Sequence, residues 1–112
     1  MIVHGKKRVG AGLLWAYEYD REATANVGDM AIVLDHLNWP KVITQTTRVE
    51  ILPFNEVTPA FALREGEGDG SLESWRTEHW RFFTRECLRI GRQVDETMPV
   101  VCESFEVIQV LE

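Results

Sequence analysis

The clearest pattern along the chain is a run of apolar residues at helical spacing over 72–90. These apolar positions are Leu72, Trp75, Phe82, Phe83 and Ile90. Ser71 is a favourable N-cap, Glu73 suits the positive end of the helix dipole, and Gly91 is a common C-terminal stop. The sequence therefore predicts a helix over 72–90 with one apolar side that faces the core.

Two further segments have the patterns of strands. The apolar run 30–34 follows the turn pair Gly28-Asp29 and is typical of a strand buried on both faces. Residues 42–52 are rich in β-branched side chains with a period of two, so we expect a strand with one solvated side that pairs with 30–34 as a hairpin. The predicted inner face carries Ile43, Thr47, Val49 and Ile51, and the predicted solvated face carries Thr44, Thr46, Arg48 and Glu50.

A short helix over 57–63 and a returning strand over 100–111 complete the predicted elements. Strands with a helix laid across them predict an α+β domain or a small β-barrel flanked by helices. The length of 112 residues is that of one domain with a single core, so we predict one domain over 1–112.

Composition narrows the classes of function. Twelve Lys and Arg oppose eighteen Asp and Glu, a net charge of −6, so no overall positive field attracts nucleic acid or anionic lipid. Contact with RNA would therefore require a local basic patch. The apolar runs are far shorter than the roughly 20 residues of a membrane-spanning helix, and the first residues lack the order of a secretory signal, so we expect a cytoplasmic protein without a membrane partner. Cys87 and Cys102 are expected to be buried thiols.

The densest positive charge is the segment Gly5-Lys6-Lys7-Arg8, which is followed by glycines at positions 10 and 12. Because glycine lets a ligand approach the backbone closely, this segment could hold a phosphate or a carbonyl group. The alternative is a solvated basic terminus without a ligand.

Glu65, Glu67 and Asp69 place three carboxylates at alternate positions in a glycine-rich segment. Such a set can supply a general base or hold a hard divalent cation, which makes a divalent metal a candidate cofactor. The same residues also have a structural explanation, because the exposed N–H groups at the start of a helix favour negative charge.

Arg81, Arg85 and Arg89 form one stripe on the predicted long helix and could contact phosphates. Glu78 and Glu86 lie three residues before two of these arginines, so a solvated, ion-paired face is the favoured interpretation.

His79 falls one turn after Trp75 and belongs to no metal-binding motif, so we interpret it as a packed or half-buried histidine. Four aromatic residues could stack nucleobases, although packing in or beside the core is the alternative. They are Trp15, Tyr17, Tyr19 and Trp39.

Six short motifs follow one another along the chain. They are Gly5-Lys6-Lys7, Gly28-Asp29, Phe54-x-x-Val57, Ala62-x-x-Glu65-Gly66-Glu67-Gly68-Asp69, Ser71-Leu72-x-x-Trp75-Arg76-x-x-His79 and Met98-Pro99-Val100-Val101-Cys102-Glu103-x-Phe105. In order and spacing they resemble the ASCH domain family. That resemblance implies a PUA-like β-barrel flanked by helices, with a cleft that binds RNA or a modified nucleoside. Two activities are associated with such domains, N4-acetylcytidine amidohydrolysis and ribonuclease action.

The resemblance also assigns candidate catalytic residues. In the amidohydrolase pattern a lysine, a threonine three residues later and a glutamate in an acidic loop act together. The lysine falls on Lys7 and the glutamate on Glu67, whereas the threonine position is Gly10 and the nearby hydroxyl position is Arg8. This departure removes the proposed nucleophile, because a lysine activates a hydroxyl only where one is present.

Larger chains that resemble this one carry an N-terminal helical segment before the Gly-Lys-Lys motif. Only residues 1–4 precede the motif here, so we expect either a shortened form or a variant that does without that segment.

The leading hypothesis is a domain that binds single-stranded RNA or a modified nucleoside and hydrolyses RNA weakly. Lys6 and Lys7 would hold phosphate or a developing oxyanion, and Glu67 with Glu65 would act as base or metal ligand. The predicted ligand-binding residues are Lys6, Lys7, Arg8, Trp15, Tyr17 and Glu65. A non-catalytic RNA or small-molecule binding module and an N4-acetylcytidine amidohydrolase are the alternatives, and a homodimer is left open.

Overall fold

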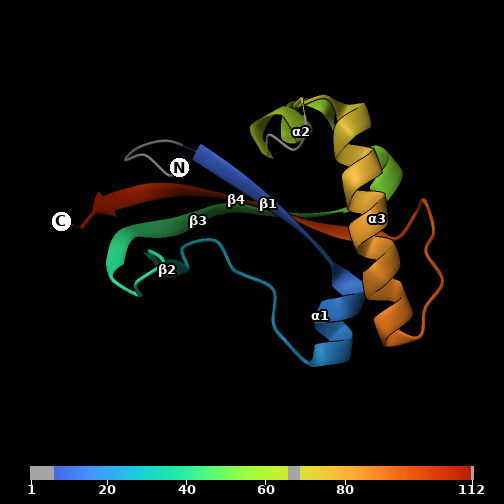
Figure 1. Ribbon diagram of the computed structural model, residues 1–112, viewed down its shortest axis with the longest axis horizontal. Coiled ribbons are helices and arrows are strands. Elements are labelled where there is room, and N and C mark those ends of the chain that lie inside the picture. The colour runs from blue at the N-terminus through green and yellow to red at the C-terminus, as the bar shows by residue number, and fades with distance from the viewer. Residues whose placement is uncertain (1–6, 66–68, 112) are drawn as a thin grey trace.

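The structure is a computed structural model that describes residues 7–65 and 69–111, with side chains from Val9 onward (Figure 1). Its four strands form one antiparallel sheet in the order β1-β4-β3-β2, curled into a half-barrel. The strands are β1 (Lys7–Leu13), β2 (Met30–Leu34), β3 (Pro40–Pro53) and β4 (Pro99–Val110). This arrangement confirms the predicted α+β class.

Three helices accompany the sheet in the described part of the chain. They are α1 (Leu14–Asp20), α2 (Pro59–Glu65) and α3 (Leu72–Ile90), with a short 3-10 turn at Phe54–Glu56. Figure 1 shows α3 along one side of the sheet, with α2 near its first turns and α1 near its last. Among the described helices, none has the length and apolar character needed to cross a lipid bilayer.

The main core lies between α3 and one face of the sheet. Trp75 and Phe83 of α3 are fully buried against Leu13 of β1 and Val100 of β4. Both cysteines belong to this core, with exposed fractions of 1% for Cys87 and 3% for Cys102, which confirms the prediction of buried thiols. Burial raises the pKa of the Cys102 thiol to about 12, so it stays protonated and unreactive at neutral pH.

The long helix begins and ends where the sequence predicts. The Ser71 hydroxyl accepts a hydrogen bond from the Ser74 N–H at 3.1 Å, and Gly91 ends the helix in the left-handed region at φ 74°. Asp69 holds this N-cap residue in place, because its Oδ1 accepts a hydrogen bond from the Ser71 N–H at 2.9 Å. Phe82 is the exception to the predicted core, since its side chain is 40% exposed.

The short helix predicted over 57–63 is present two residues later as α2. Thr58 sets this start, because its hydroxyl accepts a hydrogen bond from the Phe61 N–H at 3.2 Å. The returning strand predicted over 100–111 is present as β4, and β2 with β3 forms the predicted antiparallel hairpin.

The prediction that 30–34 is buried on both faces is wrong. β2 is the last strand of the sheet, and Met30 and Ile32 are 65% and 59% exposed. An edge strand pairs on one side only, and no described helix lies against this one in Figure 1.

The predicted inner face of β3 is also wrong. Val42 and Thr44 are buried, whereas Ile51 is 51% exposed. The pairing with β4 shifts between Ile43 and Thr44 and again between Thr46 and Arg48. At the first shift the extra residue is on β4, whereas at the second it is Thr47 of β3. The extra residue at Thr47 breaks the period of two, so a single alternation does not hold along β3.

The neighbouring residues Phe82 and Phe83 test how the core depends on α3. We expect Phe83→Ala to lower the free energy of unfolding by about 3–5 kcal/mol, because it leaves a cavity at a fully buried site. Phe82→Ala, the matched control, should cost about 1 kcal/mol or less because its ring is partly exposed. Urea denaturation of both variants measures the difference, and equal losses would contradict this assignment of the core.

The cap at the start of α3 predicts a pH dependence of stability. Hydrogen bonds from Ser71, with a further one from Ser74, lower the pKa of Asp69 to about 2. Because this folded-state pKa lies below the ordinary value of 3.8, the stabilisation is complete above about pH 5 and is lost progressively as the pH falls through 2. Asp69→Asn should therefore lower the melting temperature much more at pH 6 than at pH 2.

Glu18→Gln is the control for this experiment, since Glu18 is exposed and accepts no side-chain hydrogen bond within the described ranges. A melting-temperature difference between Asp69→Asn and the parent chain that is as large at pH 2 as at pH 6 would show that the carboxylate is not the stabilising group.

Candidate functional site

A buried polar cluster links the end of α2 to α3. The Trp75 indole N–H donates a hydrogen bond to Glu65 Oε1 at 2.7 Å, and His79 Nε2 lies 3.3 Å from Glu65 Oε2. Trp75 and His79 are one helical turn apart, and their rings stack at 4.2 Å with an angle of 13° between their planes. The Glu65 side chain is only 14% exposed, so its carboxylate is fixed by α3 on both oxygens.

The ring nitrogens of His79 have distinct roles. Nδ1 lies 3.0 Å from the Trp75 carbonyl oxygen, which can only accept a hydrogen bond, so Nδ1 carries a proton. Nε2 then faces a carboxylate oxygen, and that contact is attractive only with a second proton between the two atoms. Glu65 is thus held through one oxygen by Trp75 and contacts His79 through the other.

This pair forms one wall of a cleft of about 300 Å³, which we call the Glu65 cleft. Its lining residues are Ala11, Glu65, Glu78, His79, Phe82 and Arg85. The half-exposed Phe82 ring and the exposed Arg85 chain lie at its opening, and Ala11 brings the backbone of β1 to its side. The cleft therefore combines a fixed acid–imidazole pair, an aromatic face and a cation.

A second recess of about 270 Å³ continues along β1, and we call it the Tyr17 recess. It shares Ala11 and Phe82 with the Glu65 cleft and is lined further by Tyr17 and by the acidic residues Asp20, Glu22 and Glu86. Burial, followed by the charges of Glu103 and Glu22, raises the pKa of Tyr17. Its acidic lining makes this recess a poor place for a phosphate.

The space around the backbone differs between Gly10 and Gly12. A Cβ on Gly12 would lie 2.9 Å from Tyr17 Cε2, so the aromatic ring requires a bare backbone there. A Cβ on Gly10 would meet no atom within 4 Å, so the position where the resemblance places a threonine has room for one.

Some of the predicted site residues lie outside the description. Lys6 and Glu67 fall in 1–6 and 66–68, and for Lys7 and Arg8 the backbone alone is described, at the start of β1. Lys7 is four residues from Ala11, about 13 Å along an extended strand. Because α2 packs against β1, the elements that carry Glu65 and Lys7 are neighbours.

The other predicted ligand-binding residues are dispersed. Glu65 lies in the cleft and Tyr17 in the adjoining recess. Trp15 packs against the core with the Arg92 guanidinium 4.4 Å from its ring centre, and Trp39 is 66% exposed on the β2–β3 hairpin. The predicted aromatic residues therefore do not form one stacking platform.

The acidic segment has two different uses within the described residues. Asp69 accepts a hydrogen bond from the N-cap residue Ser71, whereas Glu65 enters the cleft. In the described part of the chain, no three side chains of the metal-ligating types converge.

The arginine stripe is ion-paired at two of its three positions. Arg81 lies 3.7 Å from Glu78, and Arg89 contacts both Glu86 at 3.0 Å and Asp20 at 2.9 Å. Arg85 makes no ion pair with any described carboxylate, although the prediction treated the stripe as one ion-paired face. It faces the cleft instead.

Sequence reasoning did not assign Phe82, Arg85 and His79 to the cleft. The sequence predicts Phe82 as a core residue because its side chain is apolar. In the structure its ring is partly exposed and lines the cleft together with Ala11 of β1. The spacing of Trp75 and His79 did signal that they share a helix face, but nothing local indicates that Glu65 lies against both.

A family model for the ASCH domain matches residues 1–109. The crystal structure of an ASCH domain from Lactobacillus crispatus JV V101 is 36% identical, with a TM-score of 0.82 over 93% of this chain and 65% of that chain. A crystal structure of a protein from Enterococcus faecalis V583 is 37% identical, with a TM-score of 0.80 over 97% of this chain and 65% of that one. This chain thus spans slightly less than two thirds of each solved structure. No curated protein shows a significant match. The chain belongs to the ASCH domain family.

Proposed function

We propose that this ASCH domain binds single-stranded RNA or a modified nucleoside in the Glu65 cleft. The observation that carries the proposal is the fixed Glu65–His79 pair at the side of a cleft that also presents Phe82 and Arg85. With His79 holding Glu65 in place, the Glu65 oxygens can each accept a further hydrogen bond from the edge of a base. The exposed Phe82 ring can stack on the face of the base, and the Arg85 guanidinium can hold a phosphate.

The size of the cleft supports a single nucleoside as the unit that enters. About 300 Å³ is at the lower end of the range for small-molecule pockets. RNA is read by sequence mainly where bases are unpaired and splayed out, so a single strand is the fitting form of polymer.

Charge supports modest, salt-dependent binding. Because the whole chain has a net charge of −6, attraction to phosphate must come from local cations such as Arg85, Lys6 and Lys7. Proposed roles for Lys6 and Lys7 are contacts to phosphate or to a developing oxyanion.

The lysine pair provides the first test. Lys6→Ala/Lys7→Ala should weaken binding of a fluorescent single-stranded RNA and lower the slope of log affinity against log salt by about 1.4, since each lost phosphate contact to a single strand contributes about 0.7. Fluorescence anisotropy at several salt concentrations measures both quantities.

The matched control removes two charges from the hairpin strand, with Lys41→Ala/Arg48→Ala. Both residues are exposed on β3, where Lys41 lies 3.8 Å from Asp35 and Arg48 lies 3.0 Å from Glu50. Equal effects of the two double variants would show that general charge, and not the start of β1, determines the affinity.

Catalysis on the bound ligand is the finer part of the proposal. In weak ribonuclease action, Lys7 would stabilise charge on the phosphate while Glu67 takes a proton from the water that attacks the phosphorus. The bond from phosphorus to the departing ribose oxygen breaks, and Glu67 passes the proton to that oxygen. The open space at Gly10 favours one alternative, in which water replaces the missing hydroxyl and attacks the acetyl carbonyl of N4-acetylcytidine. Glu67 would accept the water proton and pass it to the departing N4 amine, which leaves cytidine and acetate.

One substrate separates these reactions from binding without chemistry. A single-stranded RNA with one N4-acetylcytidine is incubated with the parent chain, Lys7→Ala and Glu67→Gln, each with and without a chelator, and is weighed by mass spectrometry. We expect slow shortening of the strand that Lys7→Ala abolishes. Loss of one acetyl group from an intact strand would instead identify the amidohydrolase, and Gly10→Thr should then accelerate it because a hydroxyl becomes available.

A saturable complex without any product after long incubation would contradict both catalytic assignments. The domain would then be a binding module that uses the same cleft.

A further inference from the structure

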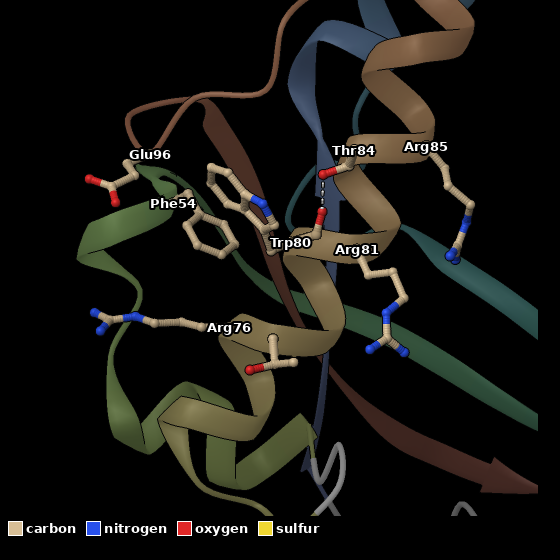
Figure 2. Close-up of a pocket in the computed structure, with 8 residues that line it drawn as sticks. Phe54, Arg76, Trp80, Arg81, Thr84, Arg85 and Glu96 are labelled. Atoms are coloured by element: carbon tan, nitrogen blue, oxygen red, sulfur yellow. Dashed lines mark hydrogen bonds between the residues drawn. The ribbon is translucent and has the colours of Figure 1, made fainter.

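A larger concave surface lies outside the Glu65 cleft, where α3 meets the Phe54–Glu56 turn and the chain before β4 (Figure 2). We call it the Trp80 groove, and its volume is about 750 Å³. Its lining residues are Phe54, Arg76, Thr77, Trp80, Arg81, Thr84, Arg85 and Glu96. None of the residues that the sequence predicts as catalytic or ligand-binding lies in it.

The floor of the groove is aromatic and held in place. Trp80 is partly buried, and its ring meets Phe54 edge-on with 5.4 Å between centres and 64° between planes. Phe54 is itself buried and packs on Trp75 at 5.5 Å, which joins the floor to the core. A ring fixed in this way offers a flat surface without losing further side-chain entropy when a planar group stacks on it.

Guanidinium groups lie on both sides of this floor. Figure 2 shows Arg76 extended on the side of Phe54 and Glu96, and Arg81 and Arg85 on the other side. Arg76 donates one long hydrogen bond, 3.4 Å to the Asn55 carbonyl, and the Arg81–Glu78 pair at 3.7 Å is exposed and weak. These three cations oppose one groove carboxylate, Glu96, in a chain whose net charge is negative.

The groove and the Glu65 cleft meet at Arg85, which lines both. With 3.6 residues per turn, the groove residues and the cleft residues occupy adjacent faces of α3, with Arg81 and Arg85 on the solvent-facing side between them. A flexible polyanion can therefore cross α3 from one concave surface to the other along these arginines.

We propose that the Trp80 groove is a second subsite for the same RNA strand, a claim that rests on the proposed function of the Glu65 cleft. One base stacks on Trp80, and the phosphates on either side of that nucleotide contact Arg76 and Arg81. Arg85 guides the strand over α3 to the cleft. An acidic peptide would contact the arginines, but its carboxylate side chains offer no planar ring to stack on Trp80. A groove that has both arginines and an aromatic floor therefore favours a nucleotide.

The test uses a fluorescent RNA octanucleotide and the variant Arg76→Ala/Arg81→Ala, neither residue of which lines the Glu65 cleft. We expect the affinity to fall roughly tenfold and the salt slope to fall by about 1.4, for two lost phosphate contacts. Lys41→Ala/Arg48→Ala is again the control with equal charge change, and it should leave both quantities nearly unchanged.

Base stacking is tested with Trp80→Leu, which keeps apolar bulk against Phe54, and with an octanucleotide whose sugars carry no bases. Thermal melting first establishes that the variant is folded. Trp80→Leu should weaken the normal strand several-fold and leave the abasic strand unaffected, because stacking needs both rings. Equal weakening of the two strands, or displacement of the RNA by polyglutamate of equal charge, would overturn the nucleotide subsite.

The outcomes separate the two proposals. If the parent chain binds the octanucleotide and Lys6→Ala/Lys7→Ala weakens it, while Arg76→Ala/Arg81→Ala behaves as the control, the cleft stands and the groove subsite is wrong. If the parent chain binds free N4-acetylcytidine but not the octanucleotide, the groove subsite is wrong and the cleft stands. If it binds neither, the proposed function fails, and the groove subsite fails with it.

Discussion

The hydrogen bond between Trp75 and Glu65 is the contact on which the site depends. Trp75 is fully buried, so its indole N–H would lack a partner without the carboxylate at the end of α2. A hydrogen bond to a charged group contributes about 1.5–3 kcal/mol, and removal of either partner leaves the other buried and unsatisfied. The same contact fixes the end of α2 beside β1, turns Glu65 towards His79 and so defines the wall of the cleft.

One helix supplies three different surfaces. The inner face of α3 carries Trp75 and Phe83 into the core, the side towards β1 carries His79 and Phe82 to the cleft, and the outer side carries Trp80 to the groove. Because the three faces share one rigid backbone, core packing sets the geometry of both concave surfaces. A site on a helix held in this way keeps its side chains more precisely placed than one built on loops.

Charge is separated along this surface although the chain as a whole is acidic. Cations gather on the solvent-facing side of α3, whereas Asp20, Glu22 and Glu86 line the Tyr17 recess. Arg89 partly neutralises this acidic region through its bonds to Asp20 and Glu86, which lower the pKa of Asp20. Positive charge thus lies on one side of Phe82 and negative charge on the other.

The sequence by itself determined the elements whose causes are local. Ser71 and Gly91 define the two ends of α3, because an N-cap and a left-handed C-terminal residue act on backbone groups only a few residues away. The family motifs identify the half-barrel with its helices. Tertiary structure decided the rest. The sequence did not predict β1, because Gly10 and Gly12 weaken its strand pattern and the strand forms by pairing with β4. It did not predict α1 either, because that helix has seven residues and no side-chain N-cap. The exposure of β2 follows from its place at the edge of the sheet. The contact between Glu65 and His79 joins two residues that no local sequence pattern relates. Both depend on how the whole chain packs, because burial and spatial proximity are properties of the packed chain.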